Sequence, residues 1–210
     1  MARIGIMGGT FDPIHVGHLS VAEQARSECE LDEVWFMPSG TPPHKKDHHI
    51  TDAKDRCAMV QLAIAPYPSF RFSDFEVRRP GNTYTAQTLK LLCEAYPQHE
   101  FFFIIGEDSF YELQTWYHPE EIMNRVTLLV AGRAYHKPHI SPENQLHFLK
   151  ERFHADIRFL HFEEIDISSQ ALRQMEGNGL NTIRYIPESV ENYIMEHGLY
   201  RDAIRTGTNT

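Results

Sequence analysis

Two histidines, His15 and His18, have a type and spacing that could do chemistry. They close the run Gly-Gly-Thr-Phe-Asp-Pro-Ile-His-Val-Gly-His at residues 8–18. Histidines three residues apart at a helix start share one face, so a single ligand can contact both rings. The glycines let the backbone approach a bulky anion, and the N–H groups and dipole of a helix N-terminus favour negative charge. The run therefore predicts a phosphate site.

The neighbouring segments are expected to position these residues. Ile4–Met7 is apolar and predicts a strand, and Leu19–Glu28 predicts a helix. A glycine pair after a strand is usually only a tight turn, and a histidine near a helix start is usually a surface or capping residue. The functional interpretation therefore depends on the combination and not on either feature alone.

That combination resembles the nucleotidyltransferase superfamily with the signature His-x-Gly-His, here residues 15–18. The wider pattern is similar to that of the bacterial nicotinate mononucleotide adenylyltransferases. The resemblance covers about residues 3–187. It implies a Rossmann-like nucleotidyltransferase fold and the transfer of an adenylyl group from ATP.

The alternation of strands and helices supports the same fold class from the sequence pattern alone. Short connections between them predict an α/β domain with a doubly wound parallel sheet and a ligand crevice at the carboxyl ends of the strands. We expect one domain over residues 1–204 and a frayed tail over 205–210. The predicted strands are 4–7, 33–38, 70–77, 100–106, 126–131 and 156–162. The predicted helices are 19–28, 52–65, 84–96 with Thr83 as its cap, 119–124, 142–153, one opening near 168, and 188–198.

A second anion site is predicted where Ser168 and Ser169 open a helix and Arg173 follows one turn later. N-capping alone would also explain the serines. The segment is similar to the superfamily signature Ile-Ser-Ser-Thr-x-x-Arg, which implies contacts with ATP phosphates. Gln170 stands where the signature has Thr, so a hydroxyl contact is not expected there.

Three further segments are candidates. The loop 39–50 carries Lys45, which could cover phosphates or belong to a solvated basic loop. Gly106 and Asp108 follow a buried strand, as ribose-binding residues often do. Trp116 is either a stacking platform for an aromatic ligand or ordinary partial core.

The resemblance assigns roles to individual residues. Catalytic roles are implied for His15, His18, Lys45 and Arg173. ATP contacts are implied for Gly8, Gly9, Thr10, Phe11, His15, His18, Gly106, Asp108, Arg133, Ile167, Ser168, Ser169 and Arg173. Contacts with the acceptor nucleotide are implied for Thr10, His44, Lys45, Thr83, Tyr84, Thr85, Trp116 and Tyr117.

The implied reaction is attack of a mononucleotide phosphate on ATP, with nicotinate mononucleotide as acceptor and deamido-NAD and pyrophosphate as products. The second pKa of a phosphate monoester is about 6, so the nucleophile is already ionised at neutral pH. Catalysis then depends on positioning and charge stabilisation, with Mg²⁺ carried by ATP and not by a dedicated protein site. No metal ligands are assigned.

Composition limits the partners. The chain has 20 Lys and Arg against 29 Asp and Glu, a net charge of −9, so a nucleic-acid surface is not expected. No apolar run is long enough for a membrane span. The three cysteines are widely spaced, as in a reduced cytoplasmic protein. Whether the chain forms a homodimer stays open.

Alternative functions differ in one feature each. A sister enzyme would use nicotinamide mononucleotide, phosphopantetheine or FMN as acceptor, or would be a cytidylyltransferase. An aminoacyl-tRNA synthetase core shares His-x-Gly-His but needs a Lys-Met-Ser-Lys-Ser segment, which this sequence lacks. A non-catalytic nucleotide-binding module would not need both histidines and Arg173. Dehydrogenase and P-loop motifs are absent from the sequence.

Overall fold

A computed structural model describes residues 1–40, 50–132, 141–161, 165 and 167–201. Its strands are β1 (Arg3–Gly9), β2 (Glu33–Pro38), β3 (Phe70–Phe72), β4 (Glu100–Gly106), β5 (Thr127–Ala131) and β6 (Ile157–Leu160). They form one six-stranded sheet in the order β3-β2-β1-β4-β5-β6, and every neighbouring pair is parallel. This order confirms the predicted doubly wound sheet.

The register of the strands brings the predicted site residues to one edge. Gly9 of β1 lies beside Pro38 of β2, and Gly106 of β4 lies beside Ala131 of β5. Because all the strands are parallel, their carboxyl ends meet at this edge of the sheet. The glycine turn after β1 and the segment after β4 are therefore neighbours in space.

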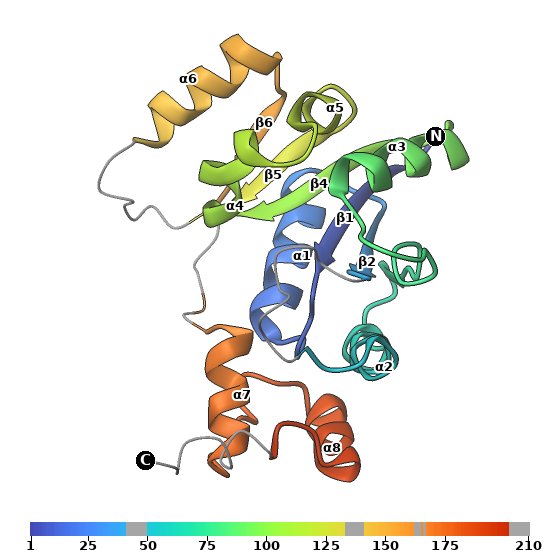
Figure 1. Cartoon of the computed structure of the whole chain (residues 1–210), viewed down its shortest axis with the longest axis vertical. Helices are drawn as coiled ribbons and strands as arrows, with labels where there is room; N and C mark the ends of the chain where they lie inside the picture. The colour runs from blue at the N-terminus through green and yellow to red at the C-terminus, as the bar shows by residue number, and fades with distance from the viewer. Residues whose placement is uncertain (41–49, 133–140, 162–164, 166, 202–210) are drawn as a thin grey trace.

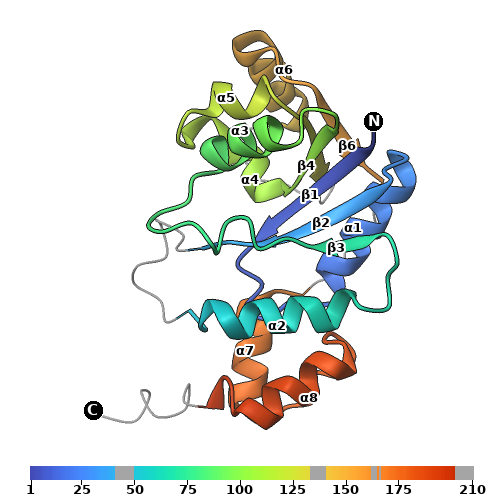
Figure 2. The ribbon, with the colours of Figure 1, turned by 90° about the vertical axis from the view of Figure 1, so that its right-hand side faces the viewer.

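Helices cover both faces of the sheet, and Figure 2 shows the two layers on either side of it. One layer contains α1 (Val16–Glu28), α2 (Ala53–Ile64), α7 (Ser169–Gly177) and α8 (Glu188–His197). The other contains α3 (Thr85–Ala95), α4 (Glu107–Glu112), the 3₁₀ turn η1 (Leu113–Thr115), α5 (Pro119–Met123) and α6 (Pro142–Phe153). Each layer has its own cluster of buried apolar side chains.

The C-terminal helices lie where the chain returns to its beginning. In Figure 1, α7 and α8 sit beyond the carboxyl end of β1, next to the start of α1. Residues from the last quarter of the described chain can therefore contact the glycine turn. No helix among the described ranges is long and apolar enough to cross a membrane.

Two local predictions were wrong, and one helix was not predicted. The strand predicted over 70–77 ends at Phe72, because the chain then folds into a turn in which Arg78 N–H donates to the Asp74 carbonyl at 3.1 Å. Thr83 does not cap α3; its hydroxyl donates to Glu76 at 3.2 Å, and Tyr84 takes the cap position. The helix α4 was not predicted, because it follows β4 without a connecting loop.

Candidate active site

The turn after β1 is shaped around the ring of Phe11. Phe11 takes a left-handed φ of 51° and is almost fully buried. Its ring lies edge-on to the His18 ring, with centroids 5.1 Å apart. A Cβ atom at Gly9 would lie only 3.1 Å from this ring, so a side chain there would displace it. Phe11 thus supports the histidines from behind the turn.

The two imidazoles stack at the start of α1. Their ring centroids are 3.8 Å apart, and the His15 backbone N–H donates to His18 Nδ1 at 3.3 Å. This bond requires Nδ1 to be unprotonated, so the neutral His18 ring carries its proton on Nε2. A Cβ atom at Gly17 would lie 3.0 Å from the His15 ring, which explains the glycine between the histidines.

Both imidazoles are neutral at physiological pH. Burial lowers the pKa of His15 to about 4. Burial, and then repulsion by His15, lowers the pKa of His18 well below its ordinary value. The buried Nδ1 atom of His15 has no hydrogen-bond partner among the described residues. The pair can therefore offer hydrogen bonds to an anion, but without an anion it carries no positive charge.

Side chains of the second motif, residues 167–173, donate hydrogen bonds to the backbone of the glycine turn. Ser169 Oγ donates to the Pro13 carbonyl at 2.9 Å, and Arg173 Nη1 donates to the Asp12 carbonyl at 2.6 Å. Ser168 caps α7 by accepting a hydrogen bond from Ala171 N at 3.1 Å. The capping interpretation is therefore confirmed for Ser168, while contacts of this motif with phosphate stay a prediction.

A residue near the end of the described chain fixes the carboxylate in the turn. Tyr200 Oη donates to Asp12 Oδ1 at 2.8 Å, and Thr51 N donates to Asp12 Oδ2 at 3.2 Å. Asp12 is only 4% exposed. Burial, and then the Asp12 carboxylate, raise the pKa of Tyr200, so its hydroxyl stays a donor. The Val16 N–H also donates to the carbonyl of Tyr185 at 2.8 Å.

Arg56 of α2 joins the ends of two strands. Its guanidinium is 2% exposed and donates to the carbonyls of Thr10 at 2.7 Å and Ser39 at 2.9 Å. Further bonds reach the carbonyls of Gly40 at 3.3 Å and Thr51 at 3.0 Å. Arg56 and Tyr200 were not predicted from the sequence, since no local pattern around either residue indicates a contact with a distant turn.

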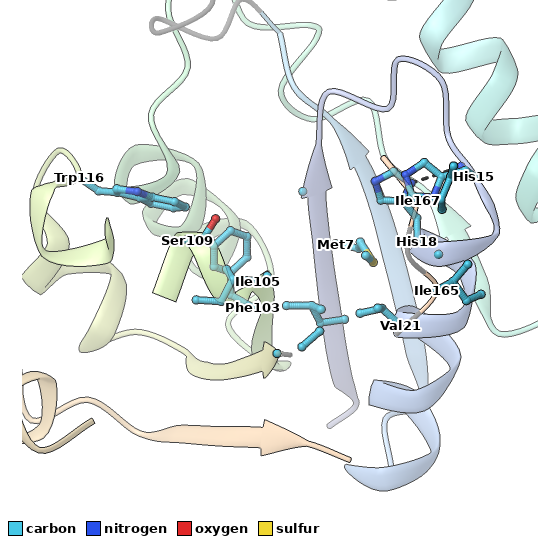
Figure 3. A pocket seen from close by; sticks show the side chains of 16 residues that line it. Met7, His15, His18, Val21, Phe103, Ile105, Ser109, Trp116, Ile165 and Ile167 are labelled. Atoms are coloured by element: carbon cyan, nitrogen blue, oxygen red, sulfur yellow. Dashed lines mark hydrogen bonds between the residues drawn. The ribbon is translucent and has the colours of Figure 1, made fainter. Parts of the chain in front are cut away.

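A first cavity of about 310 Å³ opens beside the histidines. Figure 3 shows Trp116 and Ser109 on one side of it and His15 and His18 on the other. The rest of its lining is mostly apolar or glycine: Met7, Gly8, Gly17, Val21, Phe103, Ile104, Ile105, Gly106, Ala131, Gly132, Ile165 and Ile167. Such a cavity suits a flat, mostly apolar ring with a polar group directed at the histidines.

A second cavity of about 320 Å³ adjoins the first. The two share Gly8, Phe103, Ser109 and Trp116 as a common wall. The other lining residues of the second cavity are Ile6, Gly9, Thr10, Met37, Ser39, Glu76, Thr83, Thr85, Thr88 and Leu89. Two ligands could therefore meet across Gly8, close to the histidines.

The predicted residues differ in their position relative to the two cavities. The first cavity is lined by His15, His18, Gly106 and Ile167, the second by Gly9, Thr10, Thr83 and Thr85, and both by Gly8 and Trp116. Phe11, Asp108, Ser168, Ser169, Arg173, Tyr84 and Tyr117 line neither; Tyr117 borders a separate hollow with His118. His44, Lys45 and Arg133 lie outside the described residues. Ser109, which lines both cavities, was missed although it follows the noted Gly-x-Asp segment.

Within the described ranges, no group of three or more His, Cys, Asp and Glu side chains could hold a metal ion. A divalent cation at this site would therefore have to be coordinated largely by a ligand. All three cysteines are free thiols.

Comparison with known proteins identifies relatives over nearly the whole chain. A family model described as cytidylyltransferase-like matches residues 6–175. A probable nicotinate-nucleotide adenylyltransferase of Lachnoclostridium phytofermentans is 40% identical over 200 residues, which is 95% of this chain and 100% of the relative. A protein of the same description from Thermomicrobium roseum is 43% identical over 203 residues, covering 96% and 92%.

Solved structures share the fold. The nicotinic acid mononucleotide adenylyltransferase of Plasmodium falciparum, complexed with NaAD, aligns with a TM-score of 0.79 at 21% identity, covering 96% of this chain and 98% of that one. A putative nicotinate-nucleotide adenylyltransferase of Vibrio parahaemolyticus aligns with a TM-score of 0.69 at 24% identity, covering 96% and 97%. At these identities the likeness concerns the fold alone.

Proposed function

Since the chain belongs to the cytidylyltransferase-like family and, within it, to the nicotinate-nucleotide adenylyltransferases, we propose that it transfers the adenylyl group of ATP to nicotinate mononucleotide. The products are deamido-NAD and pyrophosphate, in NAD biosynthesis. The observation that carries the proposal is the neutral pair His15 and His18 at the point where two cavities share Gly8.

ATP occupies the first cavity in this proposal. The adenine ring fits the apolar lining around Ile105 and Ile167, and the phosphates lie toward His15 and His18. The His15 ring lines this cavity, so it can donate a hydrogen bond to a phosphoryl oxygen. Arg173 is on the adjoining helix α7 and holds the Asp12 carbonyl, so its role is both to fix the turn and to lend positive charge near the β- and γ-phosphates.

The acceptor occupies the second cavity, with its phosphate directed at the shared wall. An oxygen of that phosphate attacks the α-phosphorus of ATP, and the bond from this phosphorus to the bridging oxygen of pyrophosphate breaks. No general base is needed, because the attacking phosphate is already ionised. His18 Nε2–H and the His15 ring donate hydrogen bonds to the oxygens on which charge accumulates.

Mg²⁺ enters with ATP in the same proposal and screens the charge of the polyphosphate. Lys45 and Arg133 are expected to add contacts to the phosphates, and His44 to the acceptor. The enzyme is expected to work in the cytoplasm, and the three free thiols support a reducing compartment. The oligomeric state is left open.

The acid is expected to be preferred over the amide. From the resemblance we expect the Trp116 indole to stack on the pyridine ring, and the backbone N–H groups of Thr85 and Tyr117 to face the substituent of that ring. A carboxylate accepts from both donors, whereas an amide directs its own N–H₂ group at one of them. Sites that leave a buried polar group unpaired reject such an analogue by as much as about 10⁴-fold.

The test is a panel of acceptors with the purified protein and Mg-ATP. Nicotinate mononucleotide, nicotinamide mononucleotide, FMN and phosphopantetheine are compared by pyrophosphate release and by mass of the product. Release that is fast only with nicotinate mononucleotide supports the proposal. Equal efficiency with acid and amide would overturn the acid preference, and no release with any acceptor would favour a nucleotide-binding module.

A further inference from the structure

The second cavity has a single acidic side chain in its described lining, Glu76. Its other polar side chains are the hydroxyls of Thr10, Ser39, Thr83, Thr85, Thr88 and Ser109 and the indole of Trp116. An acidic group is unexpected there, because the acceptor brings a phosphate and a second carboxylate. Glu76 comes from the turn after β3, a segment to which no role has been given so far.

Glu76 is held in place by two buried threonines. Thr88 Oγ1 donates to Glu76 Oε1 at 2.7 Å, and Thr83 Oγ1 donates to Glu76 Oε2 at 3.2 Å. Arg79 Nη1 in turn donates to Thr88 Oγ1 at 2.8 Å. Thr88 and Thr83 are 2% and 7% exposed. The carboxylate is therefore fixed in direction, and each of its oxygens has one bond to a threonine.

A carboxylate can accept about four hydrogen bonds, two on each oxygen, and it donates none when ionised. Glu76 can therefore bind further donors from within the cavity. The phosphate and the pyridine carboxylate of the acceptor are themselves anionic acceptors, so Glu76 repels them. The O–H groups of the acceptor are those of its ribose.

We infer that Glu76 binds a ribose hydroxyl of the mononucleotide acceptor and so selects ribonucleotides over deoxyribonucleotides. This inference rests on the proposed function, because it takes a pyridine mononucleotide as the occupant of the second cavity. It also orients the acceptor: the ribose lies toward Glu76 and Thr88, the ring toward Trp116 and Phe103, and the phosphate toward Gly8.

The test combines a change in the protein with a change in the substrate. The efficiency kcat/KM is measured for nicotinate mononucleotide and for its 2′-deoxy and 3′-deoxy forms, with wild type and with Glu76→Gln. In wild type, loss of the bonded hydroxyl is expected to lower kcat/KM about 10- to 100-fold, the range for a hydrogen bond to a charged group. In Glu76→Gln, which keeps the shape of the side chain, that penalty shrinks to about threefold or less. The KM for ATP stays unchanged.

Glu33→Gln is the matched control. Glu33 also accepts two side-chain hydrogen bonds, from Trp35 Nε1 and Arg71 Nε, but lies outside both cavities. This control should keep the full penalty for the deoxy acceptors. A penalty that is the same in Glu76→Gln as in wild type would overturn the inference, as expected if Glu76 pairs with the pyridinium ring instead.

The deoxy acceptors test the role of Glu76 in the wild-type protein, so this measurement does not require a variant to fold. Turnover of nicotinate mononucleotide with no penalty for either deoxy form would overturn the role of Glu76 and leave the adenylyltransferase intact. Absence of turnover with nicotinate mononucleotide itself would overturn both.

Discussion

The two cavities share one wall but differ in the polar groups that line them. In the first, His15, His18 and Ser109 provide the polar side-chain atoms beside the indole of Trp116, and the remaining lining is aliphatic, aromatic or glycine. In the second, six hydroxyl groups and one carboxylate surround the space. A ligand in the first cavity would thus meet few hydrogen-bonding side chains. A ligand in the second would meet six hydroxyl groups and one carboxylate.

Neither cavity has an arginine or lysine in its described lining. Arg56 and Arg173 donate to carbonyls of the glycine turn, and Arg79 donates to Thr88, whose side chain lines the second cavity. These arginines therefore stabilise the turn and the cavity wall. Residues that line the cavities and residues that hold the turn should therefore respond differently to substitution.

The largest effect is expected from the histidines, because the proposed function places them at the reacting phosphate. His18→Ala should lower kcat about 100- to 1,000-fold, equivalent to about 2.7–4 kcal/mol, because a donor to the transition state is lost. His15→Ala should have a smaller effect of the same kind. Both variants are checked by steady-state pyrophosphate release, and circular dichroism should report a normal fold. His197→Ala, an exposed histidine on α8, is the control. Unchanged kcat in either site variant would contradict the assignment.

Substitution of Arg56 should act mainly on the free energy of unfolding. Arg56→Met removes the donor to four carbonyls, three of them following β1 and β2 and one preceding α2, and the free energy of unfolding should fall by about 3 kcal/mol. Urea denaturation of wild type and variant gives this difference. Arg71→Met, an exposed arginine on β3, should change it by about 0.5 kcal/mol or less. Equal stability of the two variants would show that Arg56 does not hold the turn in place.

The neutral histidines predict how stability depends on pH. Burial lowers the pKa of His15 to about 4 from an ordinary value of 6.5, so the unfolded chain binds its proton more tightly. The free energy of unfolding therefore keeps the full contribution of this residue above pH 6.5 and loses it between 6.5 and 4, by about 3 kcal/mol in total. His15→Gln should abolish this loss, as measured by denaturation at several pH values. Parallel profiles for both proteins would mean that His15 is not buried as a neutral ring.

Substitution of Trp116, in the wall that both cavities share, should give the smallest effect, and this effect should differ between the two ligands. Trp116→Ala should weaken binding of nicotinate mononucleotide by about 1–3 kcal/mol, the range for a base stacked on an aromatic side chain. The effect on ATP should be smaller, although the indole borders both cavities. Calorimetry with each ligand separates the two, and Trp116→Phe should restore most of the acceptor affinity. Equal losses for both ligands would show that the wall does not distinguish them.

The sequence predicts the parts of this molecule that follow from local pattern. The strand Glu100–Gly106 is an almost continuous apolar run before a turn signal, and its predicted bounds match the structure. Ser141 and Pro142 open α6 as a cap and first residue usually do. The Phe70–Val77 strand was predicted too long, because the apolar pattern continues while the chain turns away at Asp74.

The parts that were missed depend on contacts between distant residues. Arg56 looks like a polar position on an ordinary helix, and only the packing of α2 against the turn makes it a buried donor. Thr83 looks like a cap, but the helix begins one residue later than predicted, so Tyr84 takes the cap position and the Thr83 hydroxyl donates to Glu76. Such contacts depend on the positions of atoms in three dimensions, which local propensity does not contain.

The hydrogen bond from Tyr200 to Asp12 joins residues that are 188 positions apart. During synthesis, at about 5–20 residues per second, the glycine turn emerges from the ribosome roughly 10–40 seconds before its last partner. Ser169 and Arg173 also arrive late. The glycine turn is therefore translated long before its supporting contacts can form. A nascent chain holds the histidines before this support exists, and nucleotide binding should begin only after Tyr200 has emerged.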